Sequence, residues 1–301
     1  MKNALFYYYQ INVIRLVKTK DYYYFKDDNN IFYLIPINRP MDYINEVINL
    51  NKMLINTRIM QIIYNVNKSP ISFINNYYYI LLRHNKNINF SLDDLYNPLY
   101  CNSEMLKLNT LNHSNWDNLW TSKIDYFEYQ KDYIKVKYPL LYKSLDYFIG
   151  LGENAITYFY SANNYLTKEI NDILVIARRR INLKDISFFN PLNLVIDHKA
   201  RDVGEYLKYI FIEDTYSYEL IEEILDNLKF STYQYCLLIS RLLFPSFYFD
   251  IYEDIVNGYT NEKEIIKILN RTDEYQEFLK YIYNYINKKK SIIKIDWLEL
   301  N

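Results

Sequence analysis

The stretch Ala177-Arg-Arg-Arg-Ile-Asn-Leu-Lys-Asp-Ile-Ser-Phe-Phe-Asn-Pro-Leu-Asn-Leu-Val-Ile-Asp-His-Lys-Ala-Arg-Asp202 is the part of the sequence that best defines the fold. It is polar and irregular, and one short apolar run within it, Leu194–Ile196, predicts a strand. On both sides of this stretch the apolar residues recur at helical spacing. The sequence therefore predicts a helical region interrupted by an irregular segment that carries Arg, Asp and Asn side chains.

Outside this stretch, the sequence pattern changes once along the chain, from strand-forming to helical. The first part is rich in aromatic and β-branched residues, which favour strands, and it contains one helical pattern at 41–56. The predicted strands are Phe6–Tyr9, Val13–Val17, Tyr22–Phe25, Ile31–Ile35, 59–66 and 77–83. The predicted helices of the second part are 116–135, 139–160, 165–176, 203–212, 217–228, 231–243, 246–257, 261–270 and 272–287.

This order predicts an α+β protein of two lobes. Residues 1–84 form a β-rich N-terminal lobe with one helix, and residues 116–301 form a larger helical lobe. The polar, Asn-rich segment 85–115 is predicted to be a linker or an inserted loop. Pro36 falls inside the last strand predicted before the helix at 41–56, and because proline cannot donate to the ladder it predicts an edge strand or a bulge there. A small β-rich lobe followed by a helical lobe is the layout of the protein-kinase-like fold.

Composition excludes several classes of function. The chain has 35 Lys+Arg against 36 Asp+Glu, and this balance disfavours a nucleic-acid binder, which needs a basic excess. The four glycines all lie beyond residue 149, so the first half contains no glycine-rich phosphate loop. Two cysteines are too few for a disulfide scaffold or a cysteine zinc site, and no apolar run is long enough to span a membrane. We therefore expect a cytoplasmic protein without a membrane or nucleic-acid partner.

Three further strings carry a family resemblance. They are Leu145-Asp-Tyr-Phe-Ile-Gly-Leu-Gly-Glu-Asn-Ala-Ile156, Val195-Ile-Asp-His-Lys-Ala-Arg-Asp-Val-Gly-Glu-Tyr206 and Ser240-Arg-Leu-Leu-Phe-Pro-Ser-Phe-Tyr-Phe249. Together they resemble the YutH spore-coat-associated proteins of endospore-forming bacteria. That family is grouped with CotS-type coat proteins in the choline kinase and aminoglycoside phosphotransferase superfamily. The resemblance extends over nearly the whole chain and is strongest over 116–260.

The resemblance implies a set of residues for phosphoryl transfer, and the N-terminal lobe lacks one of these residues. A strand Lys should hold the nucleotide phosphates, and a helix Glu should position that Lys. The Lys position falls at or beside Pro36, and proline has no amine to pair with a phosphate. Glu46 is the candidate for the partner Glu, and its alternative interpretation is an ordinary solvated helix residue.

The catalytic-loop segment permits two alignments with the family. In the preferred one, Arg180 stands at the position of the base, and Asp185 and Asp197 stand at the two metal positions. Because arginine stays protonated, such a loop has no base. In the other alignment Asp185 is the base, and Asn190 and Asp197 hold the metal. Only seven residues then separate Asn190 from Asp197, which is short for the usual hairpin.

The remaining charged residues have two interpretations each. Arg178, Arg179 and Arg180 either form a solvated basic turn or bind an anion, such as a phosphate or a partner's carboxylate. Asp197 either holds a metal or belongs to a structural cluster with Arg201 and Asp202. Asp202 is placed where an N-cap is expected, just before the predicted helix 203–212.

We therefore expect a pseudokinase that serves as a binding or structural component and needs no cofactor. The resemblance implies a place in the bacterial spore coat, or in the cytoplasm of the cell that builds it, with other coat proteins as partners. The alternative is an active small-molecule kinase that uses Mg–ATP, with Asp185 as the base and Asp197 on the magnesium.

Overall fold

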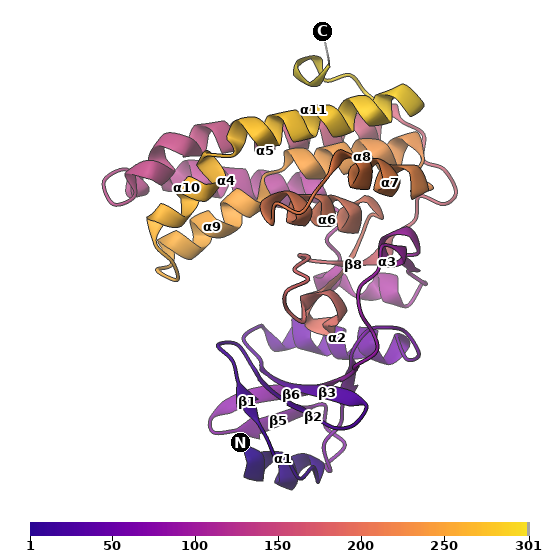
Figure 1. The fold of residues 1–301 in the computed structure, drawn as a ribbon, viewed down its shortest axis with the longest axis vertical. Helices are drawn as coiled ribbons and strands as arrows, with labels where there is room; N and C mark the ends of the chain where they lie inside the picture. The colour runs from indigo at the N-terminus through magenta and orange to yellow at the C-terminus, as the bar shows by residue number, and fades with distance from the viewer. Residues whose placement is uncertain (300–301) are drawn as a thin grey trace. The chain divides into compact units, whose positions relative to one another are not determined.

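The computed structural model describes residues 1–299, which form two compact units (Figure 1). Unit 1 consists of Met1–Ser91, Cys101–Asn112 and Arg178–Ile196. Unit 2 consists of Leu92–Tyr100, His113–Ala177 and the chain from Asp197 onward. Unit 1 thus includes the segments 101–112 and 178–196, which the sequence assigned to the linker and to the helical lobe.

Unit 1 is built on an antiparallel sheet with the strand order β1-β2-β3-β6-β4, and β5 also pairs with β6. The strands are β1 (Val17–Lys18), β2 (Tyr23–Lys26), β3 (Asn30–Pro36), β4 (Gln61–Ile63), β5 (Ile71–Ile74) and β6 (Tyr77–Asn85). Strand β3 lies between β2 and β6, and Pro36 at its end pairs with Tyr79. The expectation that Pro36 marks an edge strand was wrong. Pro36 needs no N–H toward β6, because the next residue, Ile37, donates to the Tyr78 carbonyl at 2.8 Å, and the pairing of β3 with β2 ends before Pro36, at Leu34.

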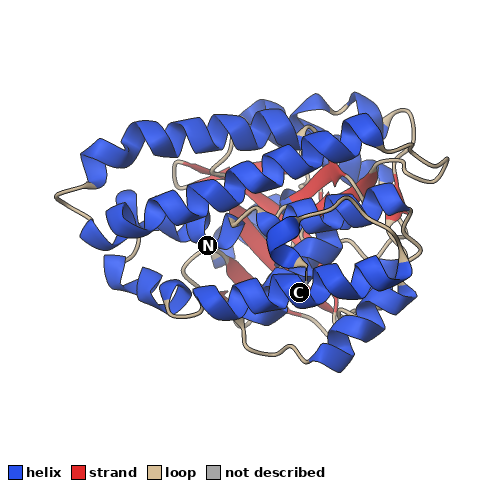
Figure 2. Cartoon of the chain, turned by 90° about the horizontal axis from the view of Figure 1, so that it is seen from above, coloured by secondary structure: helices blue, strands red, loops and turns tan. Residues whose placement is uncertain are grey.

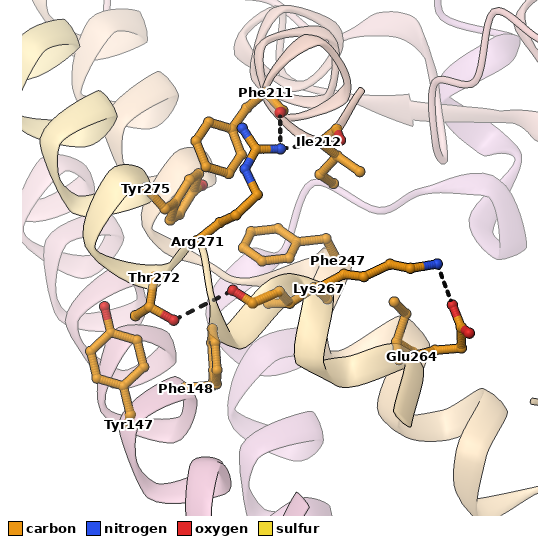
Figure 3. A pocket seen from close by; sticks show the side chains of 12 residues that line it. Tyr147, Phe148, Phe211, Ile212, Phe247, Glu264, Lys267, Arg271, Thr272 and Tyr275 are labelled. Atoms are coloured by element: carbon orange, nitrogen blue, oxygen red, sulfur yellow. Dashed lines mark hydrogen bonds and ion pairs between the residues drawn. The ribbon is translucent and has the colours of Figure 1, made fainter. Parts of the chain in front are cut away.

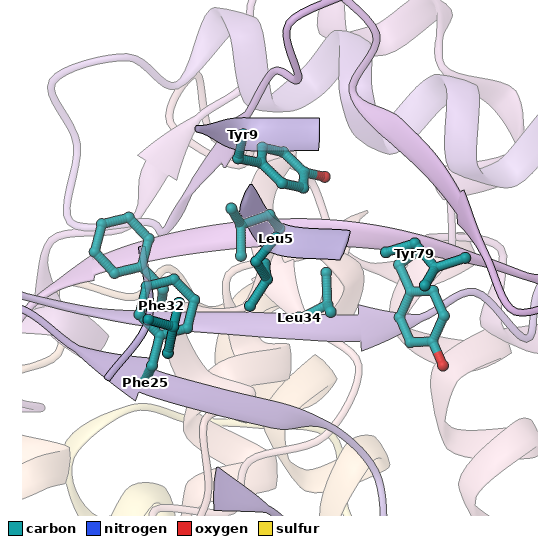
Figure 4. Close-up of a cluster of buried hydrophobic side chains, with 9 residues drawn as sticks. Leu5, Tyr9, Phe25, Phe32, Leu34 and Tyr79 are labelled. Atoms are coloured by element: carbon teal, nitrogen blue, oxygen red, sulfur yellow. The ribbon is translucent and has the colours of Figure 1, made fainter. Parts of the chain in front are cut away.

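The first element of unit 1 is a helix, α1 (Lys2–Tyr9), where the sequence predicted a strand over Phe6–Tyr9. Leu5 and Tyr9 lie one helical turn apart, and both are buried in a cluster on one face of the sheet. The other members labelled in Figure 4 are Phe25, Phe32, Leu34 and Tyr79. Burial of this apolar pair against the sheet overrides the strand preference of the tyrosines.

Helix α2 (Met41–Met53) lies on the face of the sheet opposite α1 (Figure 1). Its buried face includes Ile44, Val47 and Ile48. Asn51 joins the helix to the sheet, since its amide donates to the Met60 carbonyl at 2.8 Å and its oxygen accepts from the Ile62 backbone at 2.9 Å. These contacts fix the orientation of α2 and therefore of Glu46, which it carries.

Unit 2 is mostly helical, and α4, α5, α8 and α11 lie side by side in it (Figure 2). Its helices are α3 (Asp93–Tyr96), α4 (Trp116–Ile134), α5 (Pro139–Tyr165), α6 (Ala200–Ile212), α7 (Tyr218–Asn227), α8 (Thr232–Leu243), α9 (Ser246–Val256), α10 (Ile266–Leu269) and α11 (Thr272–Lys289). Stacked aromatic rings hold them together. Trp120 stacks on Phe244 with ring centroids 4.5 Å apart, and Phe148 stacks on Tyr248 at 3.7 Å.

Two predictions for the chain beyond residue 84 need correction. Residues 165–176 do not form a helix; α5 continues to Tyr165, and the chain then runs irregularly into strand β8 (Val175–Arg178). The segment predicted as a linker contains α3, strand β7 (Leu99–Tyr100) and two short 3-10 helices, η1 (Met105–Lys107) and η2 (Asn109–Leu111). The short strand predicted at Leu194–Ile196 is confirmed as β9 (Leu194–Asp197).

Candidate functional site

Asp197 ends strand β9 and is fully buried within unit 2. Both of its carboxylate oxygens are used by the chain. Oδ1 accepts from the His198 backbone N–H at 2.7 Å, and Oδ2 accepts from Trp116 Nε1 at 3.1 Å. Oδ2 also forms an ion pair with Arg201, whose side chain is 4% exposed. A metal ion at Oδ2 would compete with a buried guanidinium for the same oxygen.

His198 follows Asp197 and is also buried. Its Nε2 lies 3.0 Å from the Ser114 carbonyl, which can only accept, so Nε2 carries the proton of the neutral ring. Its Nδ1 is buried without a hydrogen-bond partner. Desolvation by burial lowers the pKa of His198 below its ordinary 6.5, although the Asp197 carboxylate acts in the opposite direction. A neutral imidazole thus packs beside the carboxylate that pairs with Arg201.

Asp202 does not occupy the cap position that the sequence predicted. Helix α6 begins at Ala200, and Lys199 is its N-cap residue, so Asp202 lies inside the first turn. An acidic residue is favoured in the first turn by the helix dipole as well as at the cap, and this explains why the sequence pattern misplaced the start of the helix. Asp202 is buried and interacts with other groups of the protein.

The three arginines of the 178–180 run all have contacts within the protein. Arg178 is buried; its Nε donates to the Phe188 carbonyl at 3.2 Å, and its guanidinium lies 4.1 Å from the centre of the Phe188 ring. Arg179 lies over the Tyr43 ring at 5.6 Å, and Arg180 donates to the Arg179 carbonyl at 2.9 Å. The anion or partner site expected at these residues stays a prediction.

Asp185 is exposed, and its carboxylate shapes the loop that carries it. One oxygen accepts from the Ser187 backbone at 2.6 Å, and the other accepts from the Asn182 amide at 2.9 Å. Asn190 similarly accepts from the Leu192 backbone at 2.9 Å. These are local turn-forming contacts. They leave Asp185 accessible to solvent, as a base would require, but no hydrogen bond between Asp185 and Asn190 forms in the described chain.

Glu46 is held by a backbone segment of unit 1. Its Oε2 accepts from the Thr110 backbone at 2.9 Å, the Thr110 hydroxyl at 2.7 Å and the Leu111 backbone at 3.2 Å. Glu46 therefore anchors the 3-10 helix η2, so neither of its two earlier interpretations describes it fully.

Sequence reasoning missed a buried charge network in unit 2. Glu205 accepts from Arg241 Nε at 2.9 Å and from its Nη2 at 2.8 Å, and Lys208 Nζ lies 3.7 Å from the same carboxylate. Arg241 also covers the Trp116 ring at 5.3 Å. The spacing of Glu205 and Lys208 on one helix face, together with Arg241 in the third quoted string, was the signal available for this network.

Within residues 1–299, three or more His, Cys, Asp or Glu side chains nowhere gather closely enough to hold a metal ion. None of the helices described there has the length and hydropathy needed to cross a membrane.

Comparisons with known proteins agree with this architecture. Residues 2–282 match the family described as "Spore coat putative kinase YutH". The chain is 28% identical over 209 residues to the endospore coat-associated protein YutH of Bacillus subtilis (strain 168), a match that spans 61% of this chain and 61% of that relative.

Solved structures give the same fold at low sequence identity. An aminoglycoside phosphotransferase from Alicyclobacillus acidocaldarius matches 93% of this chain and 94% of its own, with a TM-score of 0.61 and 9% identity. The spectinomycin phosphotransferase APH(9)-Ia, in complex with ADP and spectinomycin, matches with a TM-score of 0.52 at 10% identity over 94% of this chain and 92% of its own. The α+β kinase-like fold predicted from the sequence is thus confirmed.

Proposed function

We propose that this chain, which belongs to the family described as "Spore coat putative kinase YutH", is a pseudokinase. In this proposal it has no phosphotransferase activity, needs no cofactor, and serves as a binding or structural component of the spore coat or of its assembly in the cytoplasm. The alternative is an active small-molecule kinase that uses Mg–ATP.

The main observation in support of an inactive protein is the environment of Asp197. In both alignments this residue is the carboxylate required for magnesium, yet it is fully buried, ion-paired with Arg201 and hydrogen-bonded to Trp116. Carboxylates that ligate magnesium keep oxygens free for the ion and its waters. Here Asp197 stabilises the start of α6 against α4 instead.

The other positions support the same conclusion. Proline at position 36 cannot supply the amine that holds nucleotide phosphates. Glu46 holds η2 through three hydrogen bonds. In the preferred alignment Arg180 stands where a proton acceptor is needed, and a guanidinium cannot accept a proton at neutral pH.

A binding role is supported by exposed aromatic side chains on unit 1. Phe73 of β5 and Tyr77 and Tyr78 of β6 are 50%, 64% and 51% exposed, and the Phe73 and Tyr78 rings lie 5.0 Å apart. Aromatic residues are enriched where proteins contact one another. The β5–β6 hairpin therefore offers apolar area for another coat component.

The decisive experiment for activity is a coupled assay of ADP release from Mg–ATP, run with and without hydroxyl-bearing aminoglycosides. We expect rates equal to those of buffer for the wild-type protein, for Asp185→Asn and for Asp197→Asn. ATP turnover by the wild-type protein that Asp185→Asn abolishes would contradict the proposal and establish the kinase alternative.

The coat assignment has its own test. A fluorescently tagged copy produced in sporulating Bacillus subtilis is expected to concentrate at the spore surface, and Tyr77→Ser with Tyr78→Ser is expected to reduce that signal. Even distribution of the wild-type protein through the cell would contradict a role in the coat.

A further inference from the structure

A cavity of about 420 Å³ lies within unit 2, among α5, α6, α9, α10 and α11 (Figure 3). Five aromatic side chains contribute to its wall, and Ile212, Ile251 and Ile268 add aliphatic surface. The aromatic residues are Tyr147, Phe148, Phe211, Phe247 and Tyr275. A volume of this size falls in the range of small-molecule sites, roughly 300–1,000 Å³, which are lined mostly by apolar and aromatic groups.

The cavity is separate from the residues considered above for catalysis. Helix α6 carries Arg201 near its start and contributes Phe211 and Ile212 at its end. Ten residues of helix separate Arg201 from Phe211, a distance of about 15 Å along the axis. None of the candidate catalytic, metal or anion-binding residues contributes to the wall.

Polar groups around the cavity already have partners in the protein. The Tyr275 hydroxyl donates to the Leu242 carbonyl at 2.6 Å, and the Tyr147 hydroxyl accepts from the Gln276 amide at 2.8 Å. Thr272 donates to the Leu269 carbonyl at 2.9 Å. Apart from the Tyr147 hydroxyl, which only accepts in this contact and can still donate, these side chains offer a bound molecule few hydrogen bonds, and its affinity would come mainly from burial of apolar surface.

The charged groups at the cavity are paired as well. Arg271 donates to both carboxylate oxygens of Glu274 at 2.7 Å and to the Phe211 carbonyl at 2.8 Å. Lys267 pairs with Glu264 at 2.7 Å, and the Lys267 side chain is 78% exposed, so this pair lies in solvent. An ionised ligand would lose its hydration inside the cavity without gaining a free counter-charge, and this loss is costly.

We propose that this cavity is a binding site for a small, uncharged aromatic molecule. Rings of such a molecule can stack on, or meet edge-on, the rings of Phe148, Phe211 and Phe247, and such pairs add to the gain from burial. The space corresponds to about a dozen water-sized groups, which suits a fused two-ring compound.

The test is isothermal titration calorimetry of the full chain with 2-naphthol. The proposal predicts saturable binding of one equivalent, and at least tenfold weaker binding of naphthalene-2-carboxylate, which has the same rings and a negative charge. No measurable binding of 2-naphthol up to its solubility would overturn the site. Equal or tighter binding of the carboxylate would overturn its preference for uncharged molecules.

Matched variants on α10 locate the binding. Ile268→Trp places an indole in the cavity and is expected to abolish binding, whereas Ile266→Trp, on the same helix but outside the cavity and 39% exposed, is expected to leave the affinity unchanged. Ile251→Trp fills the cavity from α9 and serves as a second blocking variant if Ile268→Trp melts early. Unchanged binding in a folded blocking variant would overturn the proposal.

Discussion

Removal of the Asp197 carboxylate tests the structural role of this residue. In Asp197→Ala the Arg201 guanidinium, with a side chain 4% exposed, stays buried without its counter-charge. Breaking a buried ion pair from one side costs about 3–5 kcal/mol. For a chain of this size each kcal/mol lowers the melting temperature by about 2 °C, so we expect a decrease of about 6–10 °C.

A double variant separates the ion pair from the rest of the environment. Asp197→Leu with Arg201→Met replaces the pair with apolar groups of similar length, and such replacements are often close to neutral. Trp116 Nε1 then remains without its acceptor, which costs about 1–3 kcal/mol. The double variant is therefore expected to be more stable than Asp197→Ala and less stable than the wild-type protein.

The measurement is thermal unfolding followed by circular dichroism, with and without magnesium. Asp125→Ala, an exposed substitution on the same helix as Trp116, serves as the control and is expected to melt like the wild-type protein. The reasoning is refuted if Asp197→Ala retains wild-type stability. It is also refuted if the loss of stability appears only when magnesium is present.

Three further predictions concern other residues of the two units. Glu46→Ala is expected to lower the free energy of unfolding by about 1 kcal/mol and to speed hydrogen exchange in η2, which mass spectrometry would detect; unchanged exchange would count against the anchoring role. Gly204→Ala is expected to cost about 1–3 kcal/mol because its Cβ would lie 2.8 Å from Arg241 Cγ, whereas Gly150→Ala, with no neighbour within 4 Å, is expected to raise stability by about 0.5–1 kcal/mol; equal melting temperatures would show the packing argument to be wrong. The lowered pKa of His198 predicts stability that is fully present above pH 6.5 and is lost as the pH decreases below it, since the unfolded chain then binds more protons; a His198→Gln variant with the same pH dependence between pH 7.5 and 5.5 would contradict this.

Much of the secondary structure followed from local pattern. The Asp and Asn residues of segment 27–30 are typical of a turn, and β2 and β3 do form a hairpin there, in which the Asp27 carboxylate accepts from the Asn29 and Asn30 backbones at 2.9 and 2.6 Å. Strand β5 was not predicted, although Asn75 and Asn76, with φ of 49° and 67°, form a two-residue turn between it and β6. Two consecutive asparagines tolerate these left-handed angles, so this signal was available.

The parts that could not be predicted depend on tertiary packing. Helix α1 forms because Leu5 and Tyr9 find a sheet to pack against, and no local pattern contains that sheet. The state of Asp197 depends on Trp116, which lies 81 residues earlier in the chain. The sequence shows that Asp197 and Arg201 are four residues apart, a spacing at which they can pair. It does not show that the Trp116 indole also binds the Asp197 carboxylate or that this carboxylate is buried.

The most direct test of the account uses the indole signals of the three tryptophans. In a protein labelled with nitrogen-15 at tryptophan, Mn²⁺ and ATP are added, and the indole N–H signals are followed by NMR. Because Trp116 Nε1 donates to Asp197, a Mn²⁺ ion bound to that carboxylate would broaden its signal first. The account predicts that the Trp116 signal persists as strongly as that of Trp297; selective loss of the Trp116 signal would contradict it.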